Sequence, residues 1–315
     1  MTANFFIALL RFLIFPGLLF TAVVGLVMSW LDRKVTARVQ WRVGPPFLQP
    51  FYDIVKLLGK EVIVPAGGSR MAFLGAPLVG LAGATLAATL IGTAAIYGGG
   101  GGGFRGDIII LLYLLVLPSL AVILGGAASK NPLASVGASR EMKLLMGYEL
   151  PFILVMLVPI IQSGGMLSLG NLLSFQAQHG SFAASLSGAV ALVAVLPCLQ
   201  AKLALVPFDQ AEAETEIMGG ALIEYSGAPL AVFKLTKAMM LFTAPMFLVV
   251  VLWGGFGQTL GSALLGIGKY VALLVLVILL RNTNPRVKIK HAVRFFWGPV
   301  TALALIAVLL ALVGV

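Results

Sequence analysis

The chain has 315 residues, of which 60% are hydrophobic and only 10% are charged, and its mean hydropathy is +1.06. A soluble domain carries about a quarter charged residues, so this composition excludes a soluble protein and indicates a polytopic integral membrane protein. The formal net charge of +10 does not indicate nucleic-acid binding, because the basic residues lie between the apolar runs, where loops on the cytoplasmic side carry them.

Eight apolar runs are long enough to cross a bilayer, for which about 20 residues suffice. They lie near residues 5–31, 71–97, 107–127, 144–162, 183–206, 222–252, 260–280 and 295–314. We expect helices, because only helices and closed barrels satisfy every backbone polar group in lipid, and these runs are too long for barrel strands. The predicted fold class is an all-α integral membrane protein, with one polytopic domain over residues 1–315.

Basic residues gather in alternate connections between these spans. They are Arg33, Lys34, Arg38, Arg42, Lys56, Lys60 and Arg70 in the first, Lys130, Arg140 and Lys143 in the third, and Arg281, Arg286, Lys288, Lys290 and Arg294 in the seventh. The positive-inside rule predicts that these connections are cytoplasmic, which places both termini outside. A run of six glycines at 98–103 is expected to be a flexible outer turn.

The first connection contains an amphipathic segment, FLQPFYDIVKLLGKE. Its residues Phe51, Ile54, Val55 and Leu58 fall at the spacing of one helix face. The segment is too short to span, so we expect a helix over 47–60 that lies in the cytoplasmic interface.

The connection between spans five and six, PFDQAEAETEIMGGALIEY, is rich in acids and has no Lys or Arg. Five of the chain's 11 acidic residues lie here, namely Asp209, Glu212, Glu214, Glu216 and Glu224. On one continuous helix, Asp209, Glu212 and Glu216 fall within about 60° of one another, whereas Glu214 points away. Glu224 lies near the same stripe only if the helix continues through Gly219 and Gly220.

Two functions are open for these acids. A stripe of carboxylates at the membrane edge is typical of a chain of protonatable sites, whereas a solvated acidic loop needs no function. For Glu214 the two interpretations are balanced. For the other four, the interleaved hydrophobic residues favour protonatable sites.

Three further charges lie within predicted spans. Glu149, in GYELPFILVMLVP, is a lone acid at the mouth of span four, where it is either functional or extends toward the interface. Lys234 and Lys237 lie three residues apart in span six, on one helix face. They are placed to pair with the acidic stripe, either within an ion pathway or as structural ion pairs.

The stretch LDRKVTARVQWRVGPPFLQP, at 31–50, follows the first span. The positive-inside rule accounts for its charge but not for the rigid GPPFLQP turn or for Trp41. Arginine with aromatic residues on a fixed loop suits the docking of a partner protein.

These motifs carry a resemblance to a known family. The stretches at 31–61 and 207–227, together with GYELP at 147–151, resemble the membrane subunit shared by respiratory complex I, where it forms the quinone chamber, and the membrane-bound [NiFe] hydrogenases. Complex I members usually have a longer turn, GPN-x-VGP-x-G, before LQP and a glutamate at the position of Asp32. The short GPPFLQP turn resembles the energy-converting hydrogenase branch, which includes formate hydrogenlyase.

The resemblance implies roles for particular residues. The acids of the 207–225 connection and Glu149 correspond to acids of the family and would form a proton or ion pathway. Lys234 and Lys237 are added to this pathway from their position in span six, not from the resemblance. The arm-docking region would comprise Asp32, Arg33, Lys34, Arg38, Arg42, Gly44, Pro45 and Pro46.

The function expected from the resemblance is that of a non-catalytic subunit of a ferredoxin- or formate-linked [NiFe] hydrogenase in a prokaryotic cell membrane. It would dock the hydrophilic arm and relay protonation changes to antiporter-like membrane subunits. The chain would hold no cofactor, because the lone Cys198 is too few thiolates for an iron–sulfur cluster; the [NiFe] centre and clusters would lie in partner subunits. The alternatives are a quinone-site subunit of a complex I-like NADH/quinone oxidoreductase, a subunit of a related sulfur-reducing complex, a stand-alone transporter and a purely structural anchor.

Overall fold

The computed structural model describes residues 2–97, 106–257 and 259–314, and within these ranges it is helical with no strand. The glycine turn expected at 98–103 lies outside the described residues. The α-helices are α1 (Thr2–Leu13), α2 (Leu18–Val39), α3 (Gln49–Leu58), α4 (Arg70–Tyr97), α5 (Asp107–Leu114), α6 (Leu117–Ala128), α7 (Pro132–Gln162), α8 (Leu169–His179), α9 (Leu186–Lys202), α10 (Glu214–Ile217), α11 (Gly227–Leu252), α12 (Leu260–Thr283), α13 (Ile289–Phe295) and α14 (Thr301–Val313). Short 3-10 turns occupy Phe182–Ala184, Gln210–Glu212 and Gly220–Leu222, and a π turn, Phe296–Val300, joins α13 to α14.

Seven helical segments of the described chain are long and apolar enough to cross a membrane. The eighth expected span, near 183–206, corresponds to the shorter apolar helix α9, Leu186–Lys202. The all-α membrane fold predicted from the sequence is therefore confirmed. The helix α3 occupies the stretch where an interfacial helix was expected.

Two helices extend well beyond the apolar runs that revealed them. The helix α2 continues through the basic residues to Val39. The helix α7 begins at Pro132, where the Asn131 side chain accepts a hydrogen bond from the backbone N–H of Leu133. Residues 132–143, which were expected to lie in a connection, are therefore helical. Hydropathy marks only the apolar part of a helix, and a capping residue sets where the helix begins.

The acidic connection is not one helix, so the predicted single stripe of acids is wrong. Its turns at 210–212, 214–217 and 220–222 are separated by breaks. Ala213 is extended, and Met218 and Gly219 adopt left-handed backbone angles of φ 53° and 92°. A left-handed residue ends a helix, so the acids do not share the face of one continuous helix.

The helix α11 lies at the centre of the bundle and is almost entirely buried along its apolar length. It packs closely against α2, where a Cβ on Gly25 would lie 2.6 Å from the carbonyl oxygen of Ala238. Such backbone contact through small residues is how membrane helices associate tightly.

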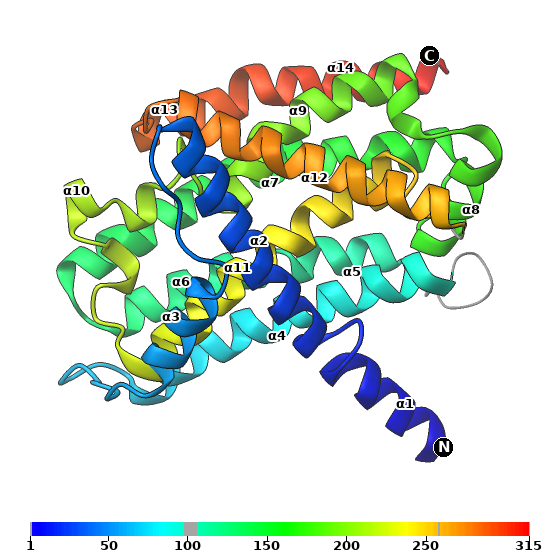
Figure 1. Cartoon of the computed structure of the whole chain (residues 1–315). Coiled ribbons are helices and arrows are strands. Elements are labelled where there is room, and N and C mark those ends of the chain that lie inside the picture. The colour runs from blue at the N-terminus through cyan, green and yellow to red at the C-terminus, as the bar shows by residue number, and fades with distance from the viewer. Residues whose placement is uncertain (1, 98–105, 258, 315) are drawn as a thin grey trace.

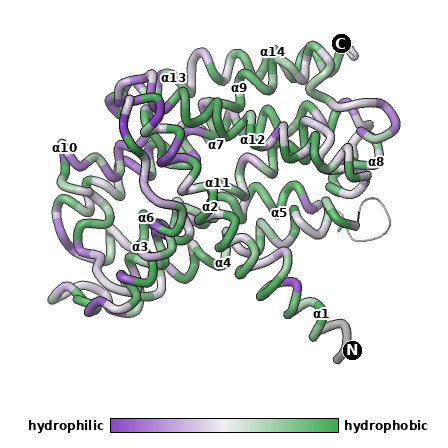
Figure 2. Tube along the Cα trace, viewed as in Figure 1, coloured by the Kyte–Doolittle hydropathy of each residue, from purple (hydrophilic) through white to green (hydrophobic). Residues whose placement is uncertain are grey.

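The bundle has one strongly polar end. The helices α3, α10 and α13 lie together at this end, and α8 and the end of α14 lie at the other (Figure 1). Figure 2 shows that hydrophilic residues gather around α10 and α13. We call this the charged end, and the candidate site lies there.

Candidate functional site: a charged cavity

A cavity of about 580 Å³ opens at the charged end, between the connection that precedes α10 and the ends of several long helices. Five acids line this charged cavity: Asp32, Glu141, Asp209, Glu212 and Glu214. Six bases also line it: Arg33, Lys202, Lys234, Lys237, Arg281 and Arg286. The acidic connection has no base of its own, so tertiary folding supplies the opposite charges from α2, α9, α11, α12 and the segment before α13.

Asp209 is held by both arms of one guanidinium. Arg286 donates from Nε to Oδ1 at 2.7 Å and from Nη2 to Oδ2 at 2.6 Å. A third donor, Nη1, reaches the hydroxyl of Thr215 at 3.0 Å. The hydrogen bonds with Asp209 raise the pKa of Arg286 above its ordinary value. This two-pronged contact fixes the acidic connection against the segment that leads into α13.

Glu212 forms the second ion pair of the cavity. Lys237 donates from Nζ to Oε2 of Glu212 at 2.7 Å, and both side chains keep partial access to solvent. The pairing of a span-six lysine with the acids is thus present. Lys234, one turn earlier, lines the same cavity but makes no ion pair with any residue that the structure describes.

The remaining acids of the connection divide between the cavity and the surface. Glu214 is exposed and lines the cavity. Glu216 lies outside it and accepts a hydrogen bond from Arg140 of α7 at 2.6 Å. Glu224 also lies outside and accepts from the side-chain amide of Asn131. The structure therefore brings together Asp209, Glu212 and Glu214.

Glu149 pairs with a residue that sequence reasoning did not single out. The Lys202 ammonium lies 3.0 Å from Oε2 of Glu149 and has no exposed side-chain surface. It also sits over the rings of Phe152 and Tyr148, at 4.6 and 5.3 Å from their centroids. Lys202 lines the charged cavity as well, so it connects the cavity to Glu149. Its signal in the sequence was a lone lysine at the end of an apolar span, which by default suggests function.

Glu141 is the second residue that sequence reasoning missed. It lies on α7, is only 3% exposed and faces the charged cavity. Two turns further along α7, the Tyr148 hydroxyl is 3.3 Å from Ser119, which also lines the cavity. The assignment of 128–143 to a connection concealed this buried acid.

Asp32 joins the cavity from the end of α2. It is 6% exposed, and its Oδ2 accepts a hydrogen bond from Arg281 at 2.6 Å. Its other oxygen, Oδ1, is buried without a hydrogen-bond partner among the described residues. Buried carboxylate oxygens are normally hydrogen-bonded, so Asp32 Oδ1 is an exception to that rule within the described residues.

The predicted docking stretch forms a fixed loop beside the cavity. Arg33 donates to Asp53 of α3 at 2.7 Å. Partial burial of Asp53 opposes ionisation, but its hydrogen bonds with Arg33 and Gln49 outweigh that effect and hold its pKa below the ordinary value of 3.8. The Trp30 indole donates to the carbonyl oxygen of Pro45 at 3.2 Å.

The other docking residues predicted from the sequence lie near this loop. Lys34 packs against Gly44, where an added Cβ would lie 2.7 Å from Lys34 Cδ. Arg38, Arg42 and Pro46 are exposed, as is Arg33. Arg38, Arg42 and Pro46 do not line the charged cavity, and Arg42 lines a smaller cavity beside it.

Neither a metal ion nor a thiolate-bound cofactor has an evident site in the described ranges. No group of three or more His, Cys, Asp or Glu side chains there is arranged to hold a metal ion. Cys198 is a buried, free thiol. The charged cavity is instead lined by five carboxylates and six basic side chains, several of them joined in ion pairs.

Comparisons with known proteins cover almost the whole chain. The model of a family described as NADH dehydrogenase matches residues 12–312. The chain is 33% identical to a subunit of the NADH-quinone oxidoreductase of Thermomicrobium roseum, with 91% of each chain covered. It is also 33% identical to "NADH-quinone oxidoreductase subunit 8" of Thermus thermophilus, with 90% of this chain and 82% of that one covered.

A solved structure gives a similarly extensive match. It is a chain of a membrane-bound sulfane sulfur reductase (MBS), described as an archaeal respiratory membrane complex. The TM-score is 0.84 at 28% identity, and the match covers 96% of this chain and 99% of that one. The similarity therefore extends over the whole bundle, not only over the acidic and basic motifs.

Proposed function

Since this chain belongs to the NADH dehydrogenase family and is a membrane subunit of a complex I-like complex, we propose that it couples redox reactions in a docked hydrophilic arm to ion movement. The observation that carries the proposal is the charged cavity, where Asp209, Glu212 and Glu214 meet bases from other elements. It lies beside the fixed 40–45 loop, which is the proposed docking site. Both therefore lie on the proposed cytoplasmic side.

The ion pairs give this coupling a physical basis. In a partly desolvated cavity, moving one charge changes the preferred partner and protonation state of its neighbours. Lys237 and Lys234 lie within reach of the connection, and Lys202 lies between the cavity and Glu149. A charge change beside the docked arm is thereby transmitted to an acid within the membrane. We place Glu216 and Glu224 at the edge of this pathway, because they do not line the cavity.

Within the family, we assign the chain to the [NiFe] hydrogenase branch. The [NiFe] centre and iron–sulfur clusters would then belong to partner subunits on the cytoplasmic side, and antiporter-like subunits would complete the membrane part. The short GPPFLQP turn supports this assignment. A second candidate is a sulfur-reducing complex, which the full-length match to the sulfane sulfur reductase chain favours. The names of the other relatives favour a quinone-site subunit as the alternative.

Isolation of the intact complex tests the proposal. The chain would be tagged at its C-terminus, extracted from its native membrane in a mild detergent, and its co-purifying subunits identified by mass spectrometry. We expect a [NiFe] large subunit and hydrogen evolution by the isolate. Sulfur reduction or NADH:quinone activity would instead assign one of the other branches. An isolate without any hydrophilic redox subunit would contradict arm docking altogether.

A further inference from the structure

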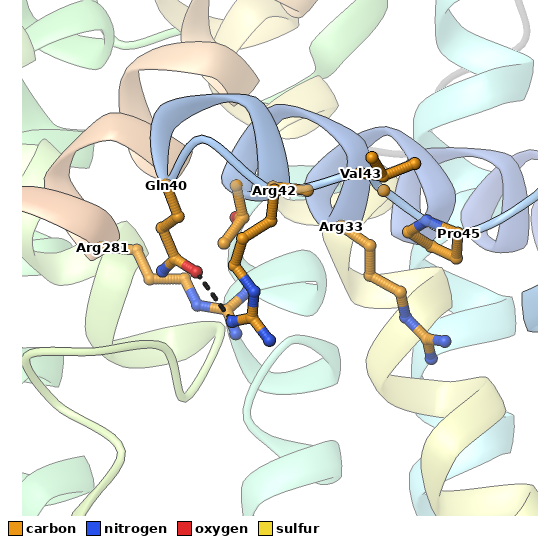
Figure 3. Close-up of a pocket in the computed structure, with 9 residues that line it drawn as sticks. Arg33, Gln40, Arg42, Val43, Pro45 and Arg281 are labelled. Atoms are coloured by element: carbon orange, nitrogen blue, oxygen red, sulfur yellow. Dashed lines mark hydrogen bonds between the residues drawn. The ribbon is translucent and has the colours of Figure 1, made fainter.

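A second, smaller cavity lies beside the charged cavity. It has a volume of about 260 Å³ and is bounded by the end of α2, the 40–45 loop and the end of α12. We call it the arginine pocket, and its lining residues are Arg33, Thr36, Ala37, Gln40, Arg42, Val43, Gly44, Pro45 and Arg281. Figure 3 shows the Arg33, Arg42 and Arg281 side chains on the same side of the loop.

The charges of the arginine pocket are unbalanced. Three guanidinium groups line it, and no carboxylate does. Arg33 and Arg281 each pair with one acid, Asp53 and Asp32, and neither acid lines the pocket. Within the part of the chain that the structure describes, the guanidinium of Arg42 makes one hydrogen bond, to the side-chain oxygen of Gln40 at 3.2 Å (Figure 3). The pocket therefore favours an anion.

The loop that forms the pocket is held in place before any partner arrives. The backbone N–H of Arg42 donates to the carbonyl oxygen of Ala37 at 2.7 Å, and the Trp30 indole holds Pro45. Trp41 adopts a left-handed backbone with φ of 57°, which turns the chain sharply at the end of α2. A site fixed in advance loses less entropy when it binds.

The rim of the pocket indicates which kind of anion it receives. Trp41 and Val43 are 98% and 99% exposed. Tryptophan and arginine are the residues that most often dominate protein–protein interfaces, and an arginine matches a carboxylate through two parallel hydrogen bonds. Trp41 directly precedes Arg42 in the loop, and Val43 lines the pocket. Three arginines with exposed apolar residues on the same loop thus fit an acidic side chain surrounded by apolar protein surface.

We propose that the arginine pocket receives an aspartate or glutamate side chain of the docked hydrophilic arm. This inference rests on the proposed function, because it names the contact by which the arm docks. Arg33 and Arg281 line both the arginine pocket and the charged cavity. An incoming carboxylate competes with Asp32 for Arg281, so movement of the arm changes the charge balance around Asp32. Docking and ion movement are then linked through Arg281, the arginine that pairs with Asp32.

Carbodiimide cross-linking of the assembled complex tests the contact. Arg42→Lys keeps the positive charge and supplies an amine, which a zero-length carbodiimide reagent joins to a touching carboxylate. We expect mass spectrometry to find residue 42 linked to an aspartate or glutamate of an arm subunit. Arg70→Lys is the matched control, because Arg70 is exposed at the start of α4 and lines neither cavity. This control is expected to give no such link at residue 70.

A second variant measures what the contact contributes. Arg42→Ala is expected to weaken retention of the arm on washed membranes by about tenfold, because one close charge pair is lost. For the same reason, retention of the arm should depend less on salt concentration in this variant than in the parent complex. Two results would overturn the inference: an assembled Arg42→Lys complex with no link at residue 42, or an Arg42→Ala complex that keeps its arm but loses bound anionic phospholipid. Either result leaves the proposed function intact, whereas an isolate without an arm would contradict the proposed function itself.

Discussion

The ion pair between Glu149 and Lys202 allows a quantitative test of the structure. Glu149→Gln removes the carboxylate that lies 3.0 Å from an ammonium with no exposed surface. Removing one partner of a buried ion pair lowers the free energy of unfolding by about 3–5 kcal/mol. The glutamine oxygen can still accept a hydrogen bond, and the rings of Phe152 and Tyr148 still face the ammonium, so we expect a cost of about 3 kcal/mol, at the low end of that range.

The partner substitution is expected to cost less. Lys202→Met removes the buried cation and leaves Glu149, whose side chain keeps 19% of its surface exposed, so we expect a cost of about 2 kcal/mol. The double variant lacks both charges. Its loss of unfolding free energy should be smaller than the sum of the losses in the two single variants by about 2 kcal/mol. The assay is unfolding of the purified protein in mixed detergent micelles, followed by tryptophan fluorescence, for all four proteins. Strictly additive costs, or a Glu149→Gln variant within about 0.5 kcal/mol of the parent, would refute the buried pair.

Three further predictions concern the charged end. Gly137→Ala on α7 should destabilise the protein by about 1–3 kcal/mol, because the added Cβ would overlap the backbone nitrogen of Ala221 in the acidic connection. Gly147→Ala is the control, since the nearest atom to its Cβ would be 3.8 Å away. Equal melting temperatures for the two variants would contradict the contact. Arg286→Ala should raise hydrogen exchange in the acidic connection about tenfold by releasing Asp209. Unchanged exchange would show that the Arg286–Asp209 pair does not hold the connection in place. The lowered pKa of Asp53 means that its ion pair contributes stability above its unfolded pKa and loses it as the pH falls through the folded value. Hydrogen-exchange protection of α3 should thus stay constant from pH 7 to about 5 and fall below about pH 4, and a decline already at pH 6 would point to another group.

The membrane architecture was predictable because hydropathy alone dictates it. Long apolar runs must become helices in lipid, and the bundle has helices wherever such runs occur. The beginning of α7 at Pro132 was not predictable from hydropathy, because its first turns are polar. The breaks at Ala213 and Met218 were also hidden, since neither residue is a strong helix breaker.

The candidate site was predictable in its acids but not in their partners. Charge composition alone isolates the 207–225 connection. Its bases come from distant parts of the chain: Arg286 follows Asp209 by 77 positions, and Arg281 follows Asp32 by 249. No local pattern reports such pairings. Lys202 and Glu141 were visible as charges, but their burial emerges only when the helices pack.

Ion movement by the intact complex in sealed vesicles tests the central claim most directly. Glu212→Gln neutralises a carboxylate of the charged cavity, whereas Glu216→Gln neutralises one that lies outside it, so the two form a matched pair. Electron transfer and ion uptake would be recorded together for each variant. We predict that Glu212→Gln lowers the number of ions moved per electron while Glu216→Gln leaves it unchanged. Unaltered electron transfer and ion uptake in the Glu212→Gln complex would contradict a coupling role for the cavity.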